Sequence, residues 1–157
     1  MLDKKQVIED TTPRKLRYFV AKFGAKYIAA DPVEDGRYPL PHKYWPSNWY
    51  PYNAIREGDV VLLFCCKDYP GHSGQIPGIG IVYHIDQGRN ENALRYHYMC
   101  LVRPIDSSMI RIRLAKTDCA ATLNGILEAG RSPYRLLFMI ENKCACALLG
   151  GCQINWP

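Results

Sequence analysis

The stretch "GDVVLLFCCKDYPGHSGQIPGIGIVYHID", which runs from Gly58 to Asp86, decides the fold that we predict for this chain. Its first part, Gly58 to Cys66, is a continuous apolar run, which is typical of a strand buried on both faces. The middle part is rich in residues that favour turns. The last part, Ile79 to Asp86, has the length and composition of a partner strand. We therefore predict a β-hairpin with a wide loop.

Downstream of the hairpin, the stretch "ALRYHYMCLVRPI" from Ala93 to Ile105 predicts a further strand. Its hairpin mate is expected at "MIRIRL", Met109 to Leu114, across a short turn, because isoleucine and arginine alternate there. These two strands would share a basic face. Its expected members are Arg95, His97, Arg103, Arg111 and Arg113.

The remaining C-terminal elements follow from capping and apolar patterns. Thr117-Asp118 is expected to cap a helix that ends at Gly130. The segment 134–140, "YRLLFMI", predicts a last strand, and a short helix is expected near Cys144–Leu149. The chain is thus predicted to be α+β, with about five strands in a curved sheet or small barrel and two or three helices. Its length fits one domain over residues 1–157.

The N-terminal region allows two interpretations. Thr11-Thr12-Pro13 is a good helix start, and apolar residues after it recur at helical spacing as far as Asp31-Pro32. The stretch "LRYFVAKF", Leu16 to Phe23, also has the composition of a strand. We favour the helix because its period extends further. Residues 32–57 are then expected to form a long structured loop, and such loops often carry function.

The composition is that of an ordinary globular protein, with 48% hydrophobic and 22% charged residues. The net charge of +5 is a mild bias toward polyanions. No stretch approaches the roughly 20 apolar residues of a membrane span, and the charged start does not resemble a secretory signal. An odd count of seven cysteines without such a signal indicates a reduced, cytoplasmic setting rather than a disulfide framework.

The loop before the hairpin, "PHKYWPSNWYPYNAIREGD" from Pro41 to Asp59, crowds tryptophan and tyrosine between prolines. Such rings can stack on a planar ligand, most plausibly a nucleobase. Trp45 and Trp49 are the expected stacking residues, and Asn53 can hydrogen-bond the edge of a base. The cations expected to contact the phosphates are Lys67, Arg56, Arg95, Arg111 and Arg113.

Other site chemistries are weaker. Cys65 or Cys66 with His72 or His84 is a possible nucleophile and base, which would make the protein a small cysteine-dependent enzyme. The exposed aromatics are also compatible with a protein-interaction or oligomerisation domain. Cys144, Cys146 and Cys152 are better interpreted as small buried thiols than as metal ligands. No phosphate-binding glycine motif is present. We predict neither a metal nor a cofactor.

The order of these features resembles the PUA-like superfamily, in particular its EVE and YTH branches. The features that carry the resemblance are Trp45, Trp49 and Asn53, then Gly58-Asp59 with Val60 to Phe64, then Gly78 to Val82. The resemblance covers residues 45–86. The Cys65-Cys66 pair departs from the family's usual polar residues.

The resemblance implies a pseudo-barrel of about five or six mostly antiparallel strands with two or three flanking helices. It also implies a non-enzymatic protein that binds RNA or DNA, often through a modified base in an aromatic cage. Trp45 or Trp49 would be a cage wall and Asn53 would contact the base edge. The pocket rim would be formed by Cys65, Cys66 and Lys67.

Overall fold

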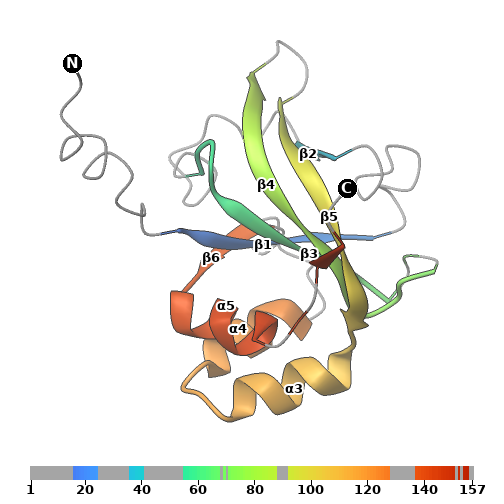
Figure 1. Cartoon of the computed structure of the whole chain (residues 1–157), viewed down its shortest axis with the longest axis vertical. Helices are drawn as coiled ribbons and strands as arrows, with labels where there is room; N and C mark the ends of the chain where they lie inside the picture. The colour runs from blue at the N-terminus through green and yellow to red at the C-terminus, as the bar shows by residue number, and fades with distance from the viewer. Residues whose placement is uncertain are drawn as a thin grey trace, which may run out of the picture.

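The computed structural model describes residues 16–24, 36–40, 55–67, 69, 71–87, 92–127, 137–150, 152 and 154–155. Its elements are β1 (Tyr18–Phe23), β2 (Arg37–Leu40), β3 (Val60–Cys65), β4 (Gln75–Gln87), β5 (Asn92–Ile105), α3 (Ser107–Ala115), α4 (Ala120–Leu127), β6 (Leu137–Ile140), α5 (Asn142–Leu149) and β7 (Ile154–Asn155). Figure 1 shows a curved sheet above a layer of helices.

The sheet has the strand order β2-β5-β4-β3-β1-β6, and β7 pairs with β5 off this path. The strands β1 and β3 run parallel, while the other pairs are antiparallel. The predicted hairpin is confirmed, because Val60 of β3 lies opposite Ile81 of β4. The predicted strand from Ala93 and the C-terminal strand and helix are also present as β5, β6 and α5. The α+β prediction and the pseudo-barrel that it implied are confirmed.

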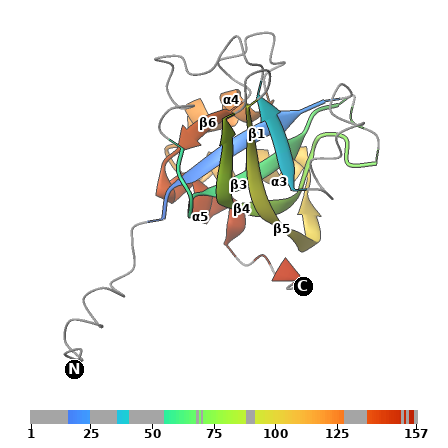
Figure 2. The ribbon, with the colours of Figure 1, turned by 90° about the horizontal axis from the view of Figure 1, so that it is seen from above.

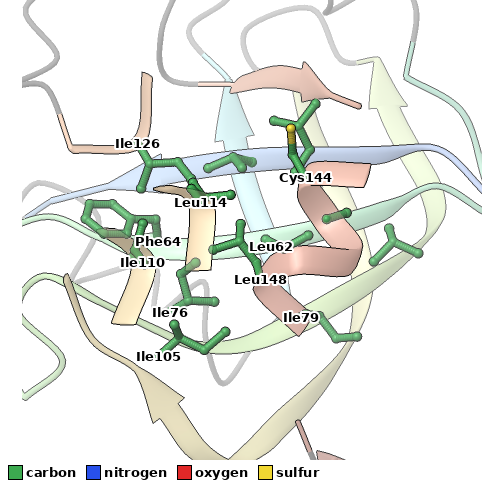
Figure 3. Close-up of a cluster of buried hydrophobic side chains, with 14 of the residues drawn as sticks. Leu62, Phe64, Ile76, Ile79, Ile105, Ile110, Leu114, Ile126, Cys144 and Leu148 are labelled. Atoms are coloured by element: carbon green, nitrogen blue, oxygen red, sulfur yellow. The ribbon is translucent and has the colours of Figure 1, made fainter. Parts of the chain in front are cut away.

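One face of the sheet packs against α3, α4 and α5, which lie on the far side of the strands in Figure 2. Figure 3 shows the apolar side chains between the two layers. The labelled members are Leu62, Phe64, Ile76, Ile79, Ile105, Ile110, Leu114, Ile126, Cys144 and Leu148. We call this side of the sheet the helix face.

The opposite side, which we call the barrel face, carries a second buried cluster. Its members are Phe19, Ala21, Tyr38, Ile55, Val61, Leu63, Cys65, Tyr69, Val82, Leu94, Tyr96 and Leu137. Successive residues of β3 alternate between the two clusters, so every residue of that strand is buried. This is why the strand lacks the polar alternation of a half-exposed strand.

The N-terminal helix prediction is wrong over residues 18–23, where the structure has β1 and thus the alternative strand. Phe19 and Ala21 belong to the barrel-face cluster, while Val20 belongs to the helix-face cluster. A strand that is apolar on both faces has apolar residues at every spacing, so it also satisfies a helical period. Residues 16, 17 and 24 are not helical either, and the parts of the predicted helix before residue 16 and after residue 24 lie outside the described residues. Strand β2 lies within the region that was expected to be a loop.

The strand predicted for Met109 to Leu114 is wrong, because this segment is part of helix α3. Asp106 begins the helix by accepting a hydrogen bond from the backbone nitrogen of Met109 at 2.8 Å. Ile110 and Leu114 are buried one turn apart, whereas Ile112 between them is 58% exposed. The alternation of apolar residues and arginine is therefore incidental.

The cysteine prediction is also wrong in two respects: Cys119 and Cys144 form a disulfide that joins the start of α4 to α5, and Cys146 is exposed rather than buried. The predicted helix after Thr117-Asp118 is present as α4. However, Cys119 occupies its N-cap position, since its carbonyl oxygen accepts the first helical hydrogen bond from Leu123. The described residues include no helix with the length and apolar character that crossing a bilayer requires.

Candidate nucleic-acid interface

The entry to β3 is built by the Gly58-Asp59 pair. Gly58 has a φ of +93°, a backbone conformation that favours glycine. Asp59 accepts two hydrogen bonds from the guanidinium of Arg17, at 3.1 and 2.7 Å. It also accepts one from the backbone nitrogen of Arg56 at 2.7 Å. This turn holds the exposed Arg56 beside the barrel.

The end of β3 carries the predicted rim residues. Cys65 is completely buried on the barrel face, Cys66 is half-buried and Lys67 is exposed. The following turn is closed by hydrogen bonds from Ser73 to the Lys67 carbonyl at 2.7 Å and from the Gly74 nitrogen to the Cys65 carbonyl at 2.9 Å. Burial and the neighbouring Cys66 raise the pKa of the Cys65 thiol to about 12.

The raised pKa of Cys65 predicts that this thiol resists alkylation in the folded protein. At pH 8 a thiol with a pKa of about 12 is ionised in roughly 1 molecule in 10,000. The exposed Cys100 and Cys146 provide matched controls. We expect iodoacetamide at pH 8 to label both controls while Cys65 stays unlabelled, as peptide mass spectrometry would measure. Labelling of Cys65 as fast as of Cys100 would contradict the buried, neutral thiol.

Four tyrosines line the barrel face, and the sequence analysis did not select them. Tyr38, Tyr69 and Tyr96 are buried, and Tyr98 is half-buried. The Tyr98 ring lies so close to Gly78 that a Cβ there would be 2.5 Å from it, and a Cβ at Gly80 would be 2.4 Å from the Tyr96 ring. The "GIG" motif thus leaves room for both rings. Gly78 and Gly80 are two residues apart, and so are Tyr96 and Tyr98 on the neighbouring strand. This matching spacing is the sequence signal that could have identified the two rings.

The side chain of Tyr98 lies near Cys65, the first residue of the Cys65–Lys67 segment. Burial raises the pKa of the Tyr98 phenol, and Cys100, Cys65 and Tyr69 raise it further. The Tyr98 phenol and the Cys65 thiol are therefore both neutral at physiological pH. Two of these neighbours, Cys65 and Tyr69, are themselves buried.

Tyr38 ties the edge strand β2 to β1. Its hydroxyl donates a hydrogen bond of 2.6 Å to the carbonyl oxygen of Lys22. The ammonium group of Lys22, whose side chain is only 1% exposed, donates to the carbonyl oxygen of Gly125 in the last turn of α4 at 3.0 Å. The negative end of a helix favours a cation at this place. Lys22 of β1 is thus hydrogen-bonded both to β2, through its carbonyl oxygen, and to α4, through its side chain.

The predicted phosphate contacts are not gathered on one surface. Arg95 lies in the first part of β5 and bonds Asp86 at 2.6 Å. The helix α3, which carries Arg111 and Arg113, follows the far end of that strand, about 30 Å away along it. Arg113 donates to the Leu148 carbonyl and to the thiol of Cys152, at 2.5 and 3.1 Å. These bonds give Arg113 a structural role at the C-terminal end of α5.

A hollow of about 440 Å³ lies between α3 and α4. It is lined by Arg111, Leu123, Asn124 and Leu127, and Arg111 is its one member among the predicted site residues. The part of the chain that the structure describes contains no group of three or more His, Cys, Asp or Glu arranged to hold a metal ion. Trp45, Trp49 and Asn53 lie outside the described residues.

No protein-family model and no curated protein sequence matches this chain. Among solved structures, it is similar to a Rhodopseudomonas palustris protein solved by NMR. The TM-score is 0.54 at 14% identity, covering 86% of this chain and 95% of the other. It is also similar to the YTH domain of the Zygosaccharomyces rouxii MRB1 protein in complex with N6-methyladenosine RNA. There the TM-score is 0.49 at 16% identity, covering 87% and 86% of the two chains.

A third similar structure is the Pho92 YTH domain in complex with m6A, with a TM-score of 0.42 at 18% identity over 65% of this chain and 69% of the other. Only the first of the three likenesses has a TM-score above 0.5, and it concerns the fold. The mostly antiparallel sheet and the three helices among the described residues agree with the pseudo-barrel that the resemblance implied, which did not specify the parallel β1–β3 pair. The chain therefore has the PUA-like pseudo-barrel fold.

Proposed function

We propose that this protein is a non-enzymatic nucleic-acid-binding domain. In this proposal it recognises a modified nucleobase at the tyrosines of its barrel face. The observation that carries this proposal is the half-exposed Tyr98 ring on the barrel face, beside the Cys65–Lys67 segment. An aromatic ring that is only partly covered can stack on a planar ligand, and stacking on a base contributes roughly 1–3 kcal/mol.

The charge state of the surroundings favours a base over an anion as the recognised group. The thiol of Cys65 and the phenol of Tyr98 are both neutral at physiological pH, and their raised pKa values move their ionisation further into the alkaline range. A neutral, flat surface suits the uncharged ring of a base, which is then identified by hydrogen bonds at its edge. The exposed Lys67 follows the end of β3 beside Cys65 and can face a backbone phosphate, whereas the exposed Arg56 precedes the start of β3, at the other end of that strand.

The predicted cage residues Trp45, Trp49 and Asn53 remain part of the proposal. They lie in the segment 41–54, and the residues on either side of that segment are anchored to the barrel face. Tyr38 on one side and Ile55 on the other are buried in the barrel-face cluster. In this proposal Trp45 and Trp49 complete a cage around a base held against Tyr98, and the burial of both flanking residues on the barrel face supports it.

Replacing Tyr98, Trp45 or Trp49 by alanine tests the proposal. Loss of one stacked ring should weaken binding of an oligonucleotide by roughly 5- to 100-fold. Fluorescence anisotropy with labelled RNA and DNA, each with and without a methylated base, would measure the effect and identify the preferred polymer. Val102→Ala removes an exposed side chain from the same strand and should leave affinity unchanged. Unchanged affinity in all three aromatic variants would contradict the aromatic site.

The cysteine-dependent enzyme is the second candidate, and the structure disfavours Cys65 as its nucleophile. A buried thiol with a raised pKa supplies almost no thiolate at neutral pH. His84, one of the two candidate bases, lies 3.2 Å from Asp86 and 3.9 Å from Glu57. Binding explains these features more simply than nucleophilic catalysis does.

A further inference from the structure

The hairpin formed by β4 and β5 carries an exposed pair of stacked rings that the proposed base site does not use. The rings of Tyr83 and His97 have centroids 4.4 Å apart and an interplanar angle of 26°. Tyr83 is 44% exposed, and His97 is also exposed. Exposed aromatic rings on a sheet surface are a common platform for unpaired bases.

Tyr83 lies on this surface at a β-bulge. The register between β4 and β5 shifts between Val82 and His84, so Tyr83 is the extra residue of the bulge. Val82 and Ile85 both pack on the barrel-face cluster, which leaves Tyr83 and His84 together on the opposite side. Bulges often re-aim a side chain at a functional surface. Regular alternation already places Tyr83 on this surface, two residues after Ile81 of the helix-face cluster, and the bulge adds the imidazole of His84 to it.

The pair lies on the helix face of the sheet but beyond the helices. His97 is two residues before Met99, which is buried in the helix-face cluster, so both side chains point to the same side. In Figure 1 the end of the hairpin made by the last part of β4 and the first part of β5 projects away from α3, α4 and α5. The described helices therefore leave this platform uncovered.

A guanidinium group completes the surface. The pKa of Arg95 is raised by Asp86, which accepts its hydrogen bond, and then by Tyr83. Arg95 thus lies beside the stacked rings, held in place by Asp86. Arg37 of β2 is directly opposite Arg95 in the strand register, so two arginines stand next to each other on this face. Adjacent guanidinium groups beside exposed rings match the alternation of phosphate and base in a nucleic-acid strand.

We propose that the Tyr83–His97 pair is a second contact for single-stranded nucleic acid. A base outside the primary site stacks on the pair, while Arg95 and Arg37 face the neighbouring phosphate. This inference rests on the proposed function, because one nucleic-acid chain would occupy both the base site at Tyr98 and the Tyr83–His97 pair. His97 and Tyr98 are adjacent in sequence and point to opposite faces of β5. The nucleic-acid chain therefore has to pass around the edge of the sheet to reach both. Only an oligonucleotide longer than the primary site reaches the pair.

The test compares a short and a long oligonucleotide with the same central base, of about 4 and about 12 nucleotides. We expect the wild-type protein to bind the long one more tightly, and Tyr83→Leu with His97→Leu to lose roughly 5- to 100-fold on the long one alone. Tyr83→Phe keeps the ring and loses only the hydroxyl beside Arg95, so it should bind like the wild type. Thermal unfolding verifies that all variants fold.

The outcomes separate this inference from the proposed function. If Tyr98→Ala weakens binding but the Tyr83 and His97 variants bind both oligonucleotides like the wild type, the platform is overturned and the base site stands. If the wild-type protein binds neither oligonucleotide, the proposed function is contradicted together with the platform. If the variants keep nucleic-acid affinity and instead dissociate an oligomer, the surface is a protein contact and the inference is overturned.

Discussion

Replacing Gly80 by alanine is expected to lower the free energy of unfolding by about 3 kcal/mol, which is a large fraction of the stability of a small domain. A Cβ at this position would lie 2.4, 2.7 and 2.9 Å from Cδ2, Cγ and Cβ of Tyr96. Tyr96 cannot yield by rotating its ring alone, because its own Cβ is among the clashing atoms. Its ring is also buried in the barrel-face cluster.

A smaller effect of opposite sign acts on the same variant. Alanine reduces the conformational freedom of the unfolded chain, which stabilises the folded state by about 0.4–1 kcal/mol. This gain is smaller than the cost of overpacking, so the net effect stays destabilising. Urea unfolding of the purified protein would measure the change.

A double-mutant cycle gives the matching control for Gly80→Ala. Combining it with Tyr96→Ala removes the ring that the new methyl group meets, so the double variant should lose less stability than the sum of the two single losses. Gly71→Ala is a second control, because no atom lies within 4 Å of a Cβ there and only the φ of +90° opposes the change. A Gly80→Ala protein as stable as the wild type would show that the tyrosine does not lie against the glycine.

Asp59→Ala is expected to cost about 2–3 kcal/mol of unfolding free energy. Asp59 is only 6% exposed and accepts three hydrogen bonds, two from Arg17 and one from the backbone of Arg56. Alanine leaves the backbone nitrogen of Arg56 without this acceptor and removes the charge that holds Arg17. Arg17 precedes β1 and Asp59 precedes β3. Losing their ion pair therefore weakens the pairing of these two parallel strands, which lie inside the sheet.

Asparagine at position 59 separates the two contributions. Asp59→Asn keeps an oxygen for the Arg56 nitrogen but removes the negative charge, so it should cost about half as much as alanine. The Arg17 side chain is 30% exposed and can be solvated when its partner is lost, which keeps the alanine cost below that of a fully buried ion pair. Thermal and urea unfolding would measure both variants. Equal stability of the alanine and wild-type proteins would remove the Gly58-Asp59 turn as a determinant of the fold.

The candidate site was only partly predictable from the sequence. Cys65, Cys66 and Lys67 lie at the end of β3 as predicted, because a continuous apolar run and a turn-rich segment locate a strand end, while their role at a pocket rim stays a prediction. Tyr98 was missed because its ring matters only in relation to Gly78 on the neighbouring strand. The grouping of Arg95 with Arg111 and Arg113 failed for the same kind of reason, since it depended on a strand that is in fact α3.

The sequence by itself determined the β3–β4 hairpin, the strand β5, the C-terminal elements and thus the α+β class. Local apolar patterns and turn residues suffice for β3, β4, β5 and α5, because hairpin pairs and helices form hydrogen bonds between residues close in the chain, while β6 was recognised from its apolar composition although its partner is the distant β1. Only the tertiary structure decided that residues 18–23 form a strand, since β1 takes its partners from β3 and β6. It likewise decided which tyrosines lie on the barrel face and which rings stay exposed. Those properties depend on what covers each face of the sheet, and that is a relation between distant segments.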